Sequence, residues 1–131
     1  MRILLDTHVL LWMLGEPYRL DKEIREILES DAEEVLFSAA NIWEIAIKSQ
    51  LGRADFAFAP GEIARAARDS GFAALLVGSE AAVHVAELPP LHCDLFDRLL
   101  VAQAITEPAI FYTADQGLPA YSELIHRLRS A

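Results

Sequence analysis

Four acidic side chains that could carry chemistry lie far apart in the sequence, at Asp6, Glu44, Asp97 and Asp115. Asp6 directly follows an apolar run that predicts a buried strand, and Asp115 comes two residues after another such run. Glu44 and Asp97 lie in segments with helical spacing. Because ligands of an open parallel sheet bind beyond the carboxyl ends of its strands, we expect the four carboxylates to meet at one edge of the sheet.

Carboxylate oxygens are hard ligands that suit Mg²⁺ or Mn²⁺. Asp6 is flanked by Leu5 and Val9, and Glu44 lies within an otherwise apolar helical segment, 41–47. Charges in apolar surroundings are costly unless something compensates them. A divalent cation would do so, and it could also polarise a phosphoryl oxygen and activate a water. The residues therefore predict metal-assisted phosphodiester chemistry, without indicating which nucleic acid is cleaved.

Each acid taken alone has a simpler interpretation as a helix cap or a solvated charge. Asp115 could be a turn residue in the segment 114–117. Asp94 and Asp97 are three residues apart and can share a helix face. Since Asp94 stands where the helix should begin, we interpret Asp94 as the N-cap and Asp97 as the ligand.

Polar neighbours of the acids are candidates for positioning them, a water or the substrate. They are Thr7, Ser38 and Thr113. Arg98 could contact a phosphate or pair with Asp94, and we favour the pairing.

Apolar runs alternate with helix-period segments, which is typical of an α/β fold with a mainly parallel sheet. We expect buried strands, each covered on both faces, at Ile3–Leu5, Val35–Phe37, Ala74–Val77 and Ile110–Thr113. Helices are expected at Val9–Leu14, from Asp21, from Ser38 or Asn41 to Leu51, and at Gly61–Asp69, Ser79–Val85, Leu95–Ile105 and Ala120–Leu128. Gly52 should take a left-handed conformation after the third helix.

Composition limits the class of protein. The 131 residues, of which 53% are apolar, predict one folded domain over 1–131 and exclude disorder. A net charge of −9 excludes a passive nucleic-acid coat, and a single cysteine excludes an internal disulfide or a multi-cysteine zinc site. The N-terminal apolar run is interrupted by Asp6 and His8, so we expect no membrane segment and a cytoplasmic protein.

Other groups of residues favour structural roles. The run 92–94 (His-Cys-Asp) lacks the second pair of ligands that a zinc finger needs, and His8, His84 and His126 are isolated. Trp12 and Trp43 lie on apolar helix faces and are expected in the core. A basic rim for a nucleic-acid backbone is the weaker interpretation of Lys48, Arg53, Arg65 and Arg68.

The chain resembles PIN-domain proteins of the VapC type, the toxins of bacterial toxin–antitoxin pairs. Four blocks in the right order and spacing carry the resemblance: Leu4-Leu5-Asp6-Thr7-His8 with Trp12; Phe37-Ser38-Ala39-Ala40 through Trp43-Glu44-Ile45-Ala46-Ile47-Lys48 with Leu51-Gly52; His92, Asp94, Phe96-Asp97-Arg98 and Ala102-Gln103-Ala104; and Thr113-Ala114-Asp115 with Tyr121. Cys93 and Leu95 depart from positions that are commonly basic and proline in the family. The chain after Asp115 is short, so a final edge strand should be absent or abbreviated.

The resemblance implies a three-layer α/β/α sandwich with four to five mainly parallel strands. It also implies a Mg²⁺- or Mn²⁺-dependent endoribonuclease whose metal-binding acids match Asp6, Glu44, Asp97 and Asp115. A metal-activated water would cleave RNA and leave 5′-phosphate and 3′-hydroxyl ends. The implied partners are RNA, a second copy of the chain, and a cognate antitoxin that inserts a segment near the acidic pocket.

Two alternatives remain at this point. One is a PIN-fold binding module without catalysis, whose acidic face engages a basic partner. The other is a related nuclease or phosphatase, directed at DNA or a phosphomonoester, with a similar acidic site.

Overall fold

A computed structural model describes residues 2–30 and 33–129. Within these residues, five parallel strands form one sheet in the order β3-β2-β1-β4-β5. The strands are β1 (Ile3–Leu5), β2 (Val35–Ser38), β3 (Ala73–Leu75), β4 (Ile110–Thr113) and β5 (Ile125–Arg127). The helices are α1 (Thr7–Gly15), α2 (Lys22–Glu29), α3 (Ala39–Gln50), α4 (Pro60–Asp69), α5 (Ser79–His84) and α6 (Leu95–Thr106). Short 3₁₀ turns lie at Pro17–Arg19, Ala54–Phe56, Val85–Glu87 and Pro119–Tyr121.

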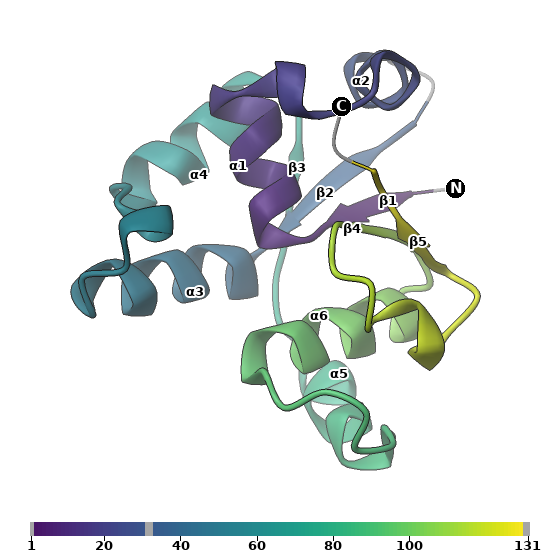
Figure 1. The fold of residues 1–131 in the computed structure, drawn as a ribbon. Helices are drawn as coiled ribbons and strands as arrows, with labels where there is room; N and C mark the ends of the chain where they lie inside the picture. Colours follow the sequence, from purple (N-terminus) through teal and green to yellow (C-terminus); the bar gives the residue numbers. More distant parts are fainter. Residues whose placement is uncertain (1, 31–32, 130–131) are drawn as a thin grey trace.

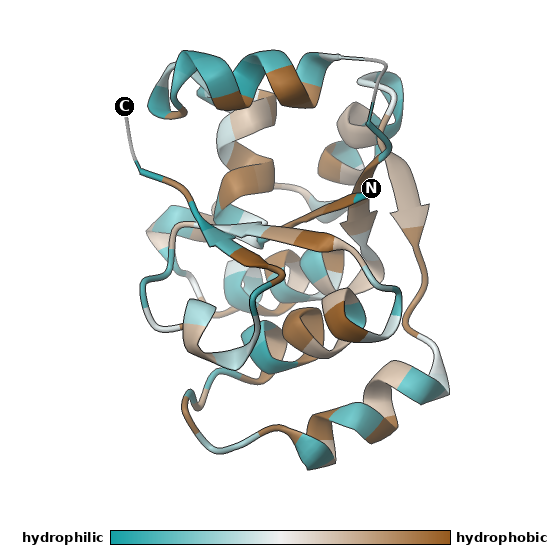
Figure 2. Ribbon diagram, turned by 90° about the vertical axis from the view of Figure 1, so that its right-hand side faces the viewer, coloured by the Kyte–Doolittle hydropathy of each residue, from teal (hydrophilic) through white to brown (hydrophobic). Residues whose placement is uncertain are grey.

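The sheet is the middle of three layers (Figure 1). Side chains alternate across it, so that Leu4 packs toward α6 while Ile3 and Leu5 pack toward α1, α2 and α4. α5 packs on α6, and α3 contacts α1, α4 and α6. Figure 2 shows apolar segments concentrated along the central strands and alternating polar and apolar segments along the outer helices. The predicted α/β sandwich with a parallel sheet is confirmed.

Three helices begin on polar caps at the carboxyl edge of the sheet. The side chain of Asp6 accepts a hydrogen bond from the backbone N–H of Thr7 at the start of α1. Ser38 caps α3 in a capping box with Asn41, and Asp94 caps α6. These caps bring the first turns of three helices to the end of the sheet where the acidic residues lie.

The C-terminal segment differs from its prediction. Residues 120–128 do not form a helix: a 3₁₀ turn ends at Tyr121 and β5 then pairs with the edge of β4. Ile125 and Leu128 are buried in the cores on opposite faces of the sheet, whereas a helix would carry both on one side. Pairing with the backbone of β4 outweighs the helical spacing, and the final edge strand is present in a short form.

The predicted burial of Leu76 and Trp43 is also wrong. β3 is an edge strand that ends at Leu75, and Leu76, expected within a covered strand, is 81% exposed. Trp43, expected in the core, is 48% exposed and packs edge-on against Phe96.

Gly52 has the left-handed conformation that was predicted, with φ of 75°. None of the helices in the described part of the chain is both long and apolar enough to cross a membrane.

Candidate active site

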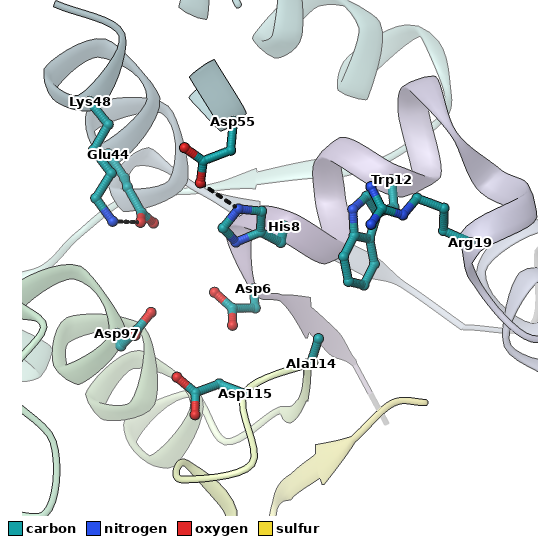
Figure 3. Close-up of a pocket in the computed structure, with 10 residues that line it drawn as sticks. All are labelled: Asp6, His8, Trp12, Arg19, Glu44, Lys48, Asp55, Asp97, Ala114 and Asp115. Carbon is teal, nitrogen blue, oxygen red and sulfur yellow. Dashed lines mark hydrogen bonds and ion pairs between the residues drawn. The ribbon is translucent and has the colours of Figure 1, made fainter. Parts of the chain in front are cut away.

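The four acids of the sequence analysis line one cleft at the carboxyl edge of the sheet (Figure 3). Asp6 follows β1, Glu44 projects from α3, Asp97 from the first turn of α6, and Asp115 follows β4. The cleft has a volume of about 460 Å³. One carboxylate oxygen from each of Asp6, Glu44 and Asp97 lies within 4.8 Å of the others.

Asp6 is buried, with 7% of its surface exposed, and both of its oxygens are engaged. Oδ1 accepts from the backbone N–H of Thr7 at 2.7 Å, and Oδ2 accepts from the hydroxyl of Thr113 at 2.5 Å. Burial, with a smaller contribution from the charge of Glu44, raises the pKa of Asp6 to about 6, although the hydrogen bonds from Thr113 and Thr7 act in the opposite direction. Thr7 and Thr113 therefore fix the direction of a carboxyl whose charged form is unfavourable.

Glu44 is 3% exposed, and its carboxylate accepts hydrogen bonds from two side chains. The hydroxyl of Thr7 donates to Oε1 at 2.5 Å, and Nζ of Lys48 donates to Oε2 at 2.5 Å. Asn41 in turn donates to the Thr7 oxygen at 3.0 Å. Burial acts to lower the pKa of Lys48, but Glu44 and Asp94 hold that pKa above its usual value. Thr7 thus links the first acid to the second, and Lys48 supplies the positive charge beside them.

Asp97 is the most perturbed acid of the cleft. Its pKa is raised to about 8, first by burial and then by the neighbouring charges of Asp6, Asp94, Glu44 and Asp115. Asp94 behaves differently: burial acts to raise its pKa, but the backbone N–H of Asp97, which it caps at 3.0 Å, and Lys48 lower it overall. The interpretation of Asp94 as the N-cap is confirmed, and Asp97 is left facing the other acids.

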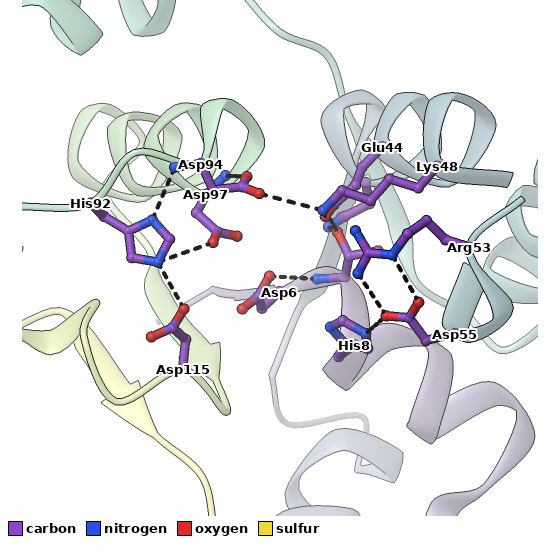
Figure 4. A network of polar contacts seen from close by, with 12 residues as sticks. Asp6, His8, Glu44, Lys48, Arg53, Asp55, His92, Asp94, Asp97 and Asp115 are labelled. Carbon is purple, nitrogen blue, oxygen red and sulfur yellow. Dashed lines mark hydrogen bonds and ion pairs between the residues drawn. The ribbon is translucent and has the colours of Figure 1, made fainter. Parts of the chain in front are cut away.

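His92 is a site residue that the sequence analysis did not identify (Figure 4). Its Nδ1 accepts from the backbone N–H of Asp94 at 3.1 Å, so Nε2 is assigned the proton and donates to Oδ2 of Asp115 at 3.0 Å. Nε2 also lies 3.6 Å from Oδ2 of Asp97. The position of His92 close to Asp94 and Asp97 in the sequence indicates that it could lie near the acids, but not which of them it contacts.

Two candidate positioning residues lie away from the acids. The hydroxyl of Ser38 donates to Gln103 at 2.5 Å and accepts from the backbone of Ala40, so it caps α3 and joins it to α6. Arg98 does not pair with Asp94 through its side chain. Its guanidinium instead donates to the hydroxyl of Tyr121 and to the carbonyls of Val85, Leu88, Pro89 and His92. Arg98 therefore supports the loop that carries His92.

The rim of the cleft contains further residues that the sequence did not single out for the site. His8 lies 3.4 Å from a carboxylate oxygen of Asp55, and both line the cleft. Trp12, expected in the core, is only partly buried and lines the cleft with Arg19. Of the proposed basic rim, Lys48 is part of the cleft, whereas Arg65 and Arg68 lie on α4 and do not line it.

The donor set fits a divalent cation. Asp97 belongs to two groups of convergent ligand atoms among the described residues, one with Asp6 and Glu44 and one with His92 and Asp115. The first group consists of carboxylate oxygens, the ligands that Mg²⁺ and Mn²⁺ prefer. Two of its three members have raised pKa values because their negative charges are buried and close together. A bound cation would remove that repulsion.

Comparisons with known proteins agree with the observed fold. The PIN domain model matches residues 3–124. The chain is similar to one in the crystal structure of VapBC2 from Rickettsia felis bound to a DNA fragment from their promoter, with 14% identity, a TM-score of 0.72, and coverage of 98% of this chain and 99% of that chain. At this identity the likeness shows the fold alone. No curated protein matches the sequence. The family model spans nearly all of the chain, and the chain belongs to the PIN domain family.

Proposed function

We propose that this protein is a divalent-metal-dependent endoribonuclease of the VapC type, acting in the cytoplasm as the toxin of a toxin–antitoxin pair. One observation carries the catalytic part of the proposal. Three carboxylates from β1, α3 and α6 converge within 4.8 Å in a cleft, and burial and mutual repulsion hold the pKa values of two of them, Asp6 and Asp97, far above the ordinary value. Perturbed acids in a cleft are typical of catalytic sites. The choice of RNA rests on the resemblance of the four sequence blocks.

Asp6, Glu44 and Asp97 would hold the ion, with Asp115 beside them. Mg²⁺ or Mn²⁺ bound there would neutralise the carboxylates, polarise a phosphoryl oxygen and lower the pKa of a water. The protein's own contribution is to hold the ligands in place. Thr113 and the N–H of Thr7 fix the two oxygens of Asp6, and His92 holds Asp115 through a hydrogen bond of 3.0 Å.

The proposed protein partners are a cognate antitoxin, with a segment entering near the acidic cleft, and a second copy of this chain. An acidic cleft favours an antitoxin segment that carries basic residues. Support for the homodimer comes from Trp43 and Ile47 on α3 and Leu51 at its C-cap, which are exposed at four-residue spacing. Exposed apolar side chains of this size along one helix are typical of an interface.

The nuclease proposal is tested by comparing three substrates with the purified protein: single-stranded RNA, single-stranded DNA of the same sequence, and a phosphomonoester. We expect cleavage of RNA with Mg²⁺ or Mn²⁺, its loss with EDTA, and its return when the ion is restored in excess. Gel analysis of the fragments should show 5′-phosphate and 3′-hydroxyl ends. Preferred cleavage of DNA would assign a DNA-directed nuclease instead, and metal-independent cleavage would contradict the proposed chemistry.

The toxin proposal predicts growth arrest in bacteria that express the protein. The arrest should be relieved by co-expression of a small protein encoded beside this gene, because an antitoxin blocks the cleft. Growth curves of cells that express the wild type, Asp97→Asn or an empty vector test this directly. Normal growth despite abundant folded wild-type protein would contradict the toxin proposal without affecting the nuclease assay.

A further inference from the structure

A second hollow adjoins the acidic cleft on the side away from Glu44 and Lys48. It has a volume of about 290 Å³ and shares four lining residues with the cleft: His8, Trp12, Arg19 and Asp55. Figure 3 shows His8 between Asp6 and Trp12, with Arg19 beyond. An RNA strand bound across the acids can therefore continue into this hollow along the protein surface.

The adjoining hollow presents aromatic surface. Trp12 is partly buried against the core, which anchors the indole, and the part left exposed lines both hollows. The ring of His8 lies 6.2 Å from the Trp12 ring and 4.9 Å from that of Phe56. Aromatic and imidazole faces of this kind stack with unpaired bases, which every sequence of single-stranded RNA offers.

Arg19 supplies a positive charge at the same place. Its guanidinium carbon lies over the Trp12 ring, 4.8 Å from the ring centre, so the cation covers part of that indole face and offers its own plane for stacking. Its acidic partner is Glu16 at 3.5 Å, and both side chains are 46% exposed, so their attraction is screened by water. Lys48, by contrast, is held by Glu44 and Asp94, and His8 faces Asp55. Among the described cations that line the cleft, Arg19 is the one most available to a phosphate.

We propose that Trp12 and Arg19 form a nucleotide subsite, in which one unpaired base of the RNA stacks on the indole–guanidinium pair and its phosphate is bound by the guanidinium N–H groups. This inference rests on the proposed ribonuclease function, because it assumes that the acids act on the same strand. It explains why a protein of net charge −9 carries an exposed arginine stacked on an aromatic ring beside the acidic cleft. It also assigns the substrate class as single-stranded, since bases inside a duplex cannot reach an aromatic side chain.

The test measures binding of a short single-stranded RNA with a fluorescent label, in EDTA so that no cleavage occurs. Trp12→Leu keeps apolar volume but removes the stacking surface, and we expect it to weaken binding about tenfold. Trp12→Phe should restore most of the affinity. Arg19→Gln should weaken binding and lower the slope of log affinity against log salt by about 0.7, the value for one phosphate contact on a single strand.

A matched control variant lies on another surface. Arg65→Gln removes an exposed arginine on α4, away from both hollows. It should bind the labelled RNA as the wild type does. In cleavage assays with metal, Trp12→Leu should raise KM with little change in kcat, because a subsite away from the reacting phosphate binds ground state and transition state alike.

The outcomes separate this inference from the proposed function. Wild-type protein that cleaves RNA, with Trp12→Leu equal to it in affinity and KM, would overturn the subsite and leave the nuclease. RNA binding that depends on Trp12 in a protein that cleaves nothing would overturn the nuclease and support the subsite. A variant that keeps its affinity for RNA but loses affinity for the antitoxin would assign this surface to the protein partner and overturn the inference. Failure of the wild type to bind the labelled RNA would also overturn it.

Discussion

Replacing either Asp6 or Asp97 by asparagine is expected to reduce RNA cleavage by at least about 100-fold. Asparagine has nearly the same shape as aspartate but carries no charge, so each substitution removes one of the three carboxylates that lie within 4.8 Å of one another. Two acids cannot offer a divalent ion the charge that three offer. Single-turnover cleavage measures the loss, and calorimetric titration with Mn²⁺ measures the binding of the ion independently of activity.

The matched control is Asp69→Asn, which removes an exposed carboxylate at the end of α4 and should leave both cleavage and metal binding unchanged. Circular dichroism of each variant verifies that the fold is retained. Full cleavage by both Asp6→Asn and Asp97→Asn would end the metal mechanism. Loss of cleavage with Mn²⁺ binding intact would show that these acids act on the substrate rather than on the ion.

The second large effect is on stability: Asp97→Asn should make the metal-free protein more stable at neutral pH, by about 1–3 kcal/mol. The pKa of Asp97 is 3.8 in the unfolded chain and about 8 in the folded one, because of burial and four neighbouring carboxylates. Between these two values the folded state binds more protons than the unfolded state. The free energy of unfolding therefore falls as pH rises through this window, and Asp6, with a pKa of about 6, adds to the fall. Asparagine removes the main part of this penalty.

Thermal unfolding in EDTA at several pH values tests this prediction. The wild type should lose stability between mildly acidic and mildly alkaline pH, and Asp97→Asn should lose much less. Asp94→Asn is the opposite control: the pKa of Asp94 is lowered overall, so its charge stabilises the fold and its removal should lower the melting temperature at neutral pH. Excess Mg²⁺ should raise the melting temperature of the wild type and not that of Asp97→Asn. Equal pH profiles for the wild type and Asp97→Asn would contradict the repulsion inferred from the structure.

The expected loss of cleavage and the expected gain in metal-free stability both come from the clustering of the same carboxylates. The carboxylates that would bind the ion repel one another without it, and this repulsion lowers the free energy of unfolding of the metal-free protein. Lys48 offsets part of the repulsion, since its ammonium contacts both Glu44 and Asp94. Sites of this kind gain both stability and activity from the ligand they bind.

Much of the site could be predicted from strand ends and helix caps, which can be recognised in the sequence. Parallel strands bring their carboxyl ends to one edge, which is why acids after β1 and β4 could be expected to meet. Helix caps follow equally local rules: Asp94 occupies the cap position that was predicted, and Ser38 is one of the two residues proposed to begin α3. The periodicity of the apolar runs was sufficient for the parallel sheet and its helical layers.

Features that depend on contacts between distant segments did not follow from the sequence. The segment 120–128 has helical spacing, but part of it forms a strand because it pairs with the open edge of β4. Arg98 turns away from Asp94 because several backbone carbonyls of the preceding loop are available to it.

The sequence by itself determined the parallel α/β architecture and the meeting of Asp6, Glu44, Asp97 and Asp115, because the ends of parallel strands and the starts of helices share one edge. Only the tertiary structure decided that His92 contacts the acids and that Trp12 and Arg19 form the mouth of an adjoining hollow. Side-chain direction is the reason: a loop and a helix face acquire their partners when separate elements pack, and no spacing along the chain encodes that choice.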